Sequence, residues 1–98
     1  MMPRAVACAR QFHATIASGH KQNALEVPFD PAQAWDIRAQ PIVRGRRGFA
    51  VRAQINGTAF DSFVVARSKK FWLLLPVDAQ ESAGVQCGDE VSVTLRAA

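Results

Sequence analysis

The segment VPFDPAQ at residues 27–33 is matched 48 positions later by LPVDAQE at residues 75–81. Each copy ends an apolar run, continues through a proline and an apolar residue, and then reaches an aspartate that is suited to begin a helix. Further along each half, a glycine, Gly48 or Gly88, precedes a run in which apolar and polar residues alternate. Half of a 98-residue chain cannot bury its own sheet face. We therefore predict two similar halves that close on each other into one β-barrel.

Alternation of apolar and polar residues with a period of two predicts most strands of this barrel. Asn56 and Gly57 favour the positive backbone angles of a tight hairpin turn, and residues 68–70 are expected to form the next turn. We expect the first two strands to pair as a hairpin as well. The six predicted strands are FHATI at 12–16, LEV at 25–27, FAVRAQI at 49–55, the less regular 58–66, FWLLL at 71–75 and VSVTL at 91–95.

Two short helices are predicted, one in each copy of the repeated segment. The sequence Asp30-Pro31 is typical of a helix start, and this helix continues toward Trp35. Asp78 and Glu81 have the spacing of a capping box, so the second helix is expected to begin there. A glycine three residues after Glu81 is suited to end it.

These patterns predict a mainly β protein, a single six-stranded barrel built from two pseudo-symmetric halves with two short helices. The barrel is expected to span residues 10–98, after a flexible tail at residues 1–9. Hydrophobic residues make up 49% of the chain, which is enough for a core. No apolar run has the length of a membrane helix or a secretory signal, and the two cysteines are isolated. We therefore expect a cytoplasmic location.

The sequence resembles two groups of known proteins. Residues 75–91, with LPVD, a short helical stretch and the turn GDEV, look like the strand, helix and glycine–aspartate turn of swapped-hairpin proteins related to AbrB regulators and MazE antitoxins. The whole span of residues 12–95, including VRAQING at 51–57, is more closely similar to a small bacterial family known only as a domain of unknown function. Its members are found alone or ahead of YdeI/OmpD-associated domains of the bacteriocin-protection type. The resemblance implies a double-split β-barrel and no catalytic residues.

Basic residues are concentrated in the middle of the chain. There are 12 Lys and Arg against 8 Asp and Glu, and no acid lies between Asp36 and Asp61, where five arginines fall. A second basic group flanks the turn at residues 68–70. The alternative is that these charges only keep loops and sheet edges in solvent. We predict that an anionic partner, nucleic acid first, contacts these residues: Arg44, Arg46, Arg47, Arg52, Lys69 and Lys70.

Two other hypotheses remain open. Trp72 and Leu74 lie in the most apolar run, so they form either part of the core or a patch for a protein partner. A small-molecule enzyme that uses Cys87 or His13 at the barrel mouth ranks last, because neither residue has the sequence neighbours of a catalytic triad or a metal site. We predict no catalytic residue, no metal and no cofactor. The leading prediction is a non-enzymatic binding module without membrane contact, monomeric or homodimeric, whose partner is nucleic acid or another protein.

Overall fold

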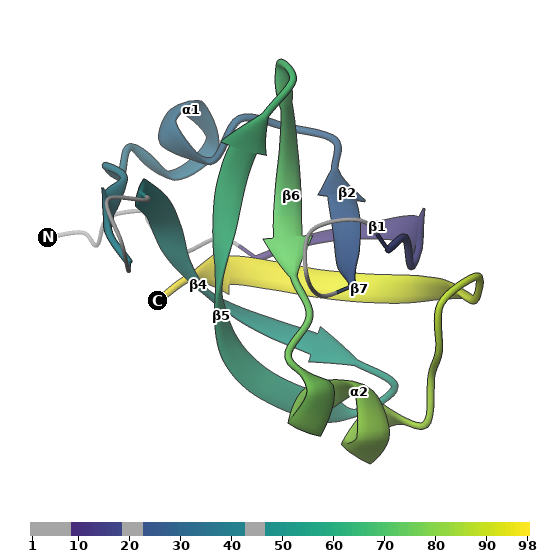
Figure 1. The fold of residues 1–98 in the computed structure, drawn as a ribbon. Coiled ribbons are helices and arrows are strands. Elements are labelled where there is room, and N and C mark those ends of the chain that lie inside the picture. The colour runs from purple at the N-terminus through teal and green to yellow at the C-terminus, as the bar shows by residue number, and fades with distance from the viewer. Residues whose placement is uncertain (1–8, 19–22, 43–46) are drawn as a thin grey trace, which may run out of the picture.

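One antiparallel β-sheet and two short helices make up the described part of the chain, residues 9–18, 23–42 and 47–98 of a computed structural model (Figure 1). Across the sheet the strands follow the order β1-β7-β4-β5-β6-β2, and β3 pairs with β4 beside this path. The strands are β1 (Arg10–Thr15), β2 (Ala24–Val27), β3 (Gln40–Pro41), β4 (Arg47–Ile55), β5 (Thr58–Arg67), β6 (Lys70–Leu74) and β7 (Glu90–Ala97). The helices are α1 (Pro31–Trp35) and α2 (Val77–Ala83).

The sheet bends until its two outer strands, β1 and β2, meet. Ala17 and Ala24 exchange backbone hydrogen bonds of 2.9 and 2.8 Å, and this bridge nearly closes the sheet into a six-stranded barrel. The predicted fold class is confirmed. The expected hairpin between the first two strands is present only as this bridge, because β1 pairs along its length with β7 and β2 pairs with β6. Alternation sets which face of a strand is buried, but it does not select the neighbouring strand.

The two halves of the barrel pair in the same way. A shift of 48 residues carries the bridge between Ala17 and Ala24 onto Val65 and Trp72, which are partners in the β5–β6 ladder. The same shift carries residue 25 onto residue 73, and these two leucines face each other where β2 meets β6. The barrel therefore consists of two pseudo-symmetric halves, as predicted. Pairing symmetry does not establish a duplication of the sequence, which stays a prediction.

Inward-facing residues of the strands fill the barrel. In β4, the buried residues Val51, Ala53 and Ile55 alternate with exposed polar residues, and β7 has the same pattern. Trp35 lies at the end of α1 and is 4% exposed, with its ring edge-to-face against Phe29 at a centroid distance of 5.3 Å. Trp35 is therefore part of the core.

The two helices begin differently, although the sequence predicted the same capping aspartate for both. Asp30 is the N-cap of α1, and its Oδ1 accepts a 2.9 Å hydrogen bond from the Ala32 amide. In contrast, α2 begins directly after Pro76, so Asp78 falls inside the first turn and makes no capping bond. The predicted capping box at Asp78 is therefore wrong. Gly84 ends α2 with a φ of 71°, as predicted.

This difference predicts unequal effects for the same substitution in the two helices. Asp30→Ala removes the acceptor for an otherwise unpaired amide and is expected to lower the free energy of unfolding by about 1 kcal/mol. Asp78→Ala removes only a favourable interaction with the helix dipole, so a smaller loss is expected. Urea denaturation of both variants measures the two losses. Equal losses would contradict the assignment of only one aspartate as a cap.

Candidate functional site

The six basic residues predicted for an anionic partner do not form one patch. Arg44 and Arg46 lie outside the described residues. Arg47 and Arg52 are both on β4, and five residues of extended strand separate their Cα atoms by about 16 Å. The described members therefore belong to two surfaces with different neighbours.

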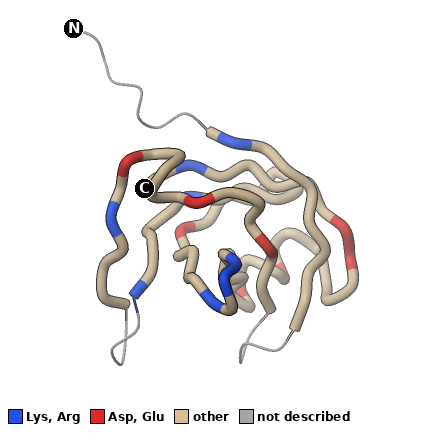
Figure 2. The backbone as a smooth tube through the Cα atoms, turned by 90° about the horizontal axis from the view of Figure 1, so that it is seen from above, with Lys and Arg blue, Asp and Glu red and all other residues tan. Residues whose placement is uncertain are grey.

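The first surface is here named the basic end. Arg47 from β4 and Arg67 from β5 line one hollow of about 290 Å³. Basic positions follow one another closely at the β5–β6 turn, which lies at the centre of the view in Figure 2. The basic end consists of Arg47, Arg67, Lys69 and Lys70.

Three members of the basic end, Arg47, Arg67 and Lys70, interact with other groups of the protein. Arg47 donates a 3.0 Å hydrogen bond to the carbonyl oxygen of Ala39, and Lys70 Nζ lies 3.7 Å from a carboxylate oxygen of Glu26. Both interactions are exposed, so they contribute little to stability. A guanidinium has five N–H donors and an ammonium has three, which leaves further donors for a partner.

The turn that presents Lys69 has an unfavourable backbone conformation. Ser68 and Lys69 have φ of 54° and 65°, in the left-handed region that costs an ordinary residue about 1 kcal/mol. The β4–β5 turn also joins its strands through two residues with positive φ, Asn56 at 52° and Gly57 at 80°, and these residue types tolerate such angles. One hairpin of the barrel therefore has suitable turn residues, and the next does not.

The second surface, here named the arginine pair, consists of Arg52 on β4 and Arg96 on β7. These residues are directly opposite each other in the β4–β7 ladder, where Cβ atoms are about 5 Å apart and like charges weaken strand pairing. On its other side Arg52 faces Asp61 of β5, with 3.2 Å between Nη1 and Oδ1. Among the described residues, no ion pair involves Arg96.

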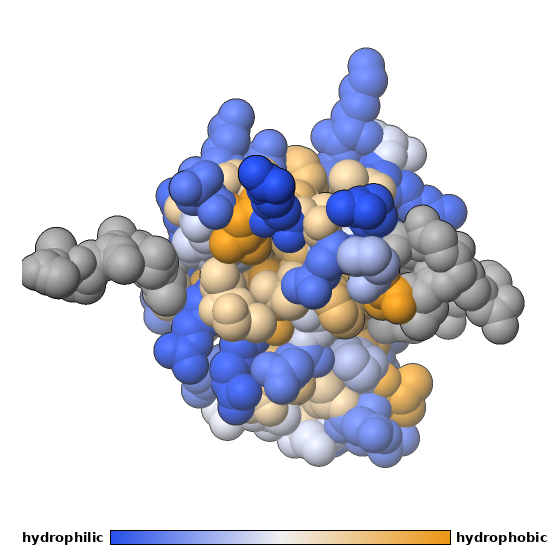
Figure 3. Space-filling view, turned by 90° about the vertical axis from the view of Figure 1, so that its left-hand side faces the viewer, coloured by the Kyte–Doolittle hydropathy of each residue, from blue (hydrophilic) through white to orange (hydrophobic). Residues whose placement is uncertain are grey.

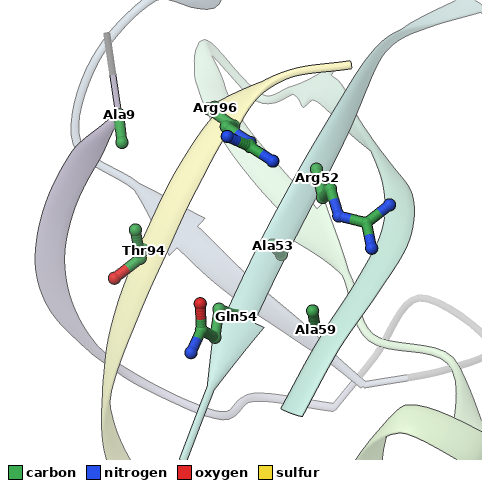
Figure 4. Close-up of a pocket in the computed structure, with 7 residues that line it drawn as sticks. All are labelled: Ala9, Arg52, Ala53, Gln54, Ala59, Thr94 and Arg96. Atoms are coloured by element: carbon green, nitrogen blue, oxygen red, sulfur yellow. The ribbon is translucent and has the colours of Figure 1, made fainter. Parts of the chain in front are cut away.

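A hollow of about 180 Å³ lies beside the arginine pair (Figure 4). Gln54 and Thr94, which also face each other across β4 and β7, contribute polar groups to it. In Figure 4 the Arg96 side chain extends toward β4, and that of Arg52 extends toward β5. The other residues that line the hollow are alanines, Ala9, Ala53 and Ala59, and the Ala53 side chain is buried inside the barrel.

Sequence reasoning missed Arg96, although a signal for its exposure was present. In the alternating run at residues 91–95 the polar residues face outward. Arg96 follows this run at the next outward-facing position. Its place beside Arg52 depends on the β4–β7 ladder, which joins distant parts of the chain.

Comparison with protein families gives a match over most of the chain. A family model described as a domain of unknown function, DUF1905, matches residues 12–95. The chain belongs to the DUF1905 family. The predicted similarity to a domain of unknown function is thus confirmed, whereas the links to AbrB, MazE and YdeI-type proteins stay predictions. A comparison with curated proteins found no match.

The patch predicted for a protein partner of this DUF1905 chain is partly buried. Leu73 is fully buried in the barrel, while Trp72 and Leu74 on either side of it are half-buried. The exposed large hydrophobic residue among those described is Val77, on α2. Figure 3 shows apolar surface in small areas between hydrophilic side chains on one face of the molecule. A partner at Trp72 and Leu74 stays a prediction.

The residues considered for an enzymatic role lie apart from the two hollows. Cys87 is exposed, and its Sγ lies 3.6 Å from the carbonyl oxygen of Ile16. His13 is exposed on β1 opposite Ser92. Within residues 9–18, 23–42 and 47–98, no group of three or more His, Cys, Asp or Glu side chains could hold a metal ion. In the same ranges, no helix has the length and apolar character needed to cross a bilayer.

Proposed function

We propose that this DUF1905 protein is a non-enzymatic cytoplasmic module that binds nucleic acid through the basic end of its barrel. The observation that carries the proposal is that Arg47 and Arg67, from neighbouring strands, line one hollow beside the turn that presents Lys69. Guanidinium groups bind phosphate oxygens through pairs of N–H donors, and ammonium groups bind them as point charges. The basic end offers both kinds of group at one place.

The distribution of charge along the chain supports this orientation. Residues 38–70 contain eight basic residues and one acid, whereas residues 71–95 contain four acids and no basic residue. The second segment includes α2, which lies at the bottom of Figure 1, while the β5–β6 turn lies at the top. The potential of such a molecule attracts a polyanion to the basic end and repels it from α2.

The conformation of the β5–β6 turn gives independent support. Lys69 has a φ of 65°, and a glycine at this position would adopt that angle without strain. Residues whose local conformation is unfavourable, and which therefore reduce stability, are expected at functional positions. A lysine at the tip of the hairpin places its charge where a long anionic partner can reach it.

We expect the protein to bind a short DNA duplex with an affinity that falls steeply as salt rises. The double variant Arg47→Gln/Lys69→Gln removes two phosphate contacts, so the slope of log K against log salt concentration should become shallower by about 1.8. Fluorescence anisotropy of labelled duplex, measured between about 50 and 200 mM salt, determines this slope.

The matched control is Arg52→Gln/Arg96→Gln, which removes the same charge from the arginine pair. Its salt slope is expected to stay close to that of the original protein, because those side chains are on the other surface. An equal change of the salt slope in both double variants would show that net charge alone determines binding. The assignment of DNA binding to the basic end would then be wrong. Absence of retention on DNA at about 50 mM salt would contradict the proposed function as a whole.

A further inference from the structure

We propose that the arginine pair is a separate binding site for one phosphate monoester group, on the outer face of β4 and β7. It lies about 16 Å along β4 from Arg47, so it is distinct from the basic end. The proposal rests on three features of the site, which are the opposition of two like charges, the hollow beside them and the donors that surround this hollow.

The opposition of Arg52 and Arg96 is unfavourable in the absence of an anion. Residues directly opposite in an antiparallel ladder interact closely, and like charges there weaken the pairing. Asp61 compensates Arg52 from the far side, through Nη1, and leaves the side toward Arg96 positive. A dianion between the two guanidinium groups would replace one repulsion with two attractions.

Two hollows border the arginine pair, and their linings differ in charge. The hollow of about 390 Å³ includes Asp61 in its lining, and this carboxylate repels an anion. The hollow of about 180 Å³ has no acidic residue in its lining. An anion is therefore expected in the smaller hollow, beside Gln54 and Thr94.

The polar groups around the smaller hollow are suited to phosphate oxygens. Each guanidinium offers a planar fork of N–H donors, the Gln54 amide offers two more, and the Thr94 hydroxyl offers one. Thr94 Oγ1 accepts a 3.4 Å hydrogen bond from Gln11, so its own proton remains available to a ligand. The hollow of about 180 Å³ has room for a tetrahedral oxyanion.

The number of donors at the site favours a phosphate monoester over a carboxylate. Arg52, Arg96 and Asp61 together have a net charge of +1, which attracts an anion but does not select its charge. A phosphate monoester carries close to two negative charges at neutral pH and has three terminal oxygens for the two forks. The expected ligand is therefore a small molecule or a modified side chain that ends in such a group.

The test is a titration of ¹⁵N-labelled protein with inorganic phosphate, with O-phosphoserine and with acetate, followed by NMR. We expect saturable shifts at the amides of Gln54 and Thr94 and at the Nε–H of both arginines with the two phosphates, and none with acetate. Arg96→Gln should weaken phosphoserine binding at least about tenfold, since it removes charge-assisted hydrogen bonds. Arg67→Gln is the matched control at the basic end. The affinity of this variant for phosphoserine should equal that of the original protein.

Three outcomes would overturn the assignment. Equal weakening by Arg67→Gln and Arg96→Gln would show a response to net charge only. Equal binding of acetate would remove the preference for a dianion. Binding of inorganic phosphate without phosphoserine would exclude a monoester. Because DNA binding is assigned to other residues, failure of this site leaves the salt-slope experiment unaffected.

A second variant separates binding from folding. Arg96→Glu places an opposite charge beside Arg52, so it should abolish phosphoserine binding while the melting temperature rises by about 1–4 °C. A lower melting temperature would show that Arg96 stabilises the fold, and the proposed site would then be wrong.

Discussion

Leu73→Ala is expected to lower the free energy of unfolding by about 3–5 kcal/mol, one of the two largest effects predicted for this protein. Leu73 is fully buried and lies opposite Leu25 in the β2–β6 ladder and opposite Val64 in the β5–β6 ladder, both of which are also fully buried. Because all three residues belong to paired strands, the neighbours cannot move in to fill the cavity. The free energy of unfolding of a domain of this size is about 5–15 kcal/mol, so this variant loses a large share of its stability.

Leu74→Ala is the matched control for this prediction. It is the same substitution at the next residue of β6, where the side chain is half-buried on the other face. We expect less than half of the loss seen for Leu73→Ala, measured by urea denaturation with unchanged m values. Similar losses for both variants would mean that β6 is buried equally on both faces, which would contradict the barrel.

Local signals predicted the elements that depend on neighbours in sequence. The Asn56-Gly57 turn is present with the expected positive φ values, and it places Ile55 opposite Thr58. Asp30 begins α1 as its type and position predicted. In each case the deciding interaction joins residues within three positions of each other, so the sequence contains all of the relevant information.

Long-range pairing could not be predicted from the same patterns. Phe12 pairs with Val93, about 80 residues away, in place of the adjacent strand. A strand with one apolar face can bury that face beside any neighbouring strand, so local alternation does not distinguish the possible pairing partners. The start of α2 was missed for a different reason. Pro76 can itself precede a helix, and the sequence does not show which of two nearby residues ends the extended segment.

The candidate site was partly predictable. Counting residues back from the Asn56-Gly57 turn places Asp61 opposite Arg52, so their ion pair could have been predicted from the hairpin. The position of Arg96 beside Arg52 could not, because β7 reaches β4 only through the closure of the barrel. The interval without acids between Asp36 and Asp61 suggested one basic patch, but extended strand separates its members.

Gly48→Val is expected to lower the free energy of unfolding by about 1–3 kcal/mol, although valine is favoured over glycine in strands. A Cβ at residue 48 would lie 2.6 Å from Ile42 Cδ1, 3.1 Å from the Val64 carbonyl oxygen and 3.2 Å from Val65 Cγ1. The end of the isoleucine side chain can move, but the Val64 carbonyl is part of the backbone of β5 and cannot. Gly48 is buried and its φ is not positive, so the requirement is for space.

Two further variants show whether space is the cause. Ala50→Val, on the same strand at a half-buried position, should change stability less than Gly48→Val. Adding Ile42→Ala to Gly48→Val should restore part of the loss, because it removes the shortest contact. Urea denaturation of the three variants measures these differences, and a Gly48→Val protein as stable as the original would contradict the close approach of β4 to β5. Gly88, the glycine that the repeat matches to Gly48, has a φ of 98° and open space around it, so its substitution by alanine acts through backbone strain alone.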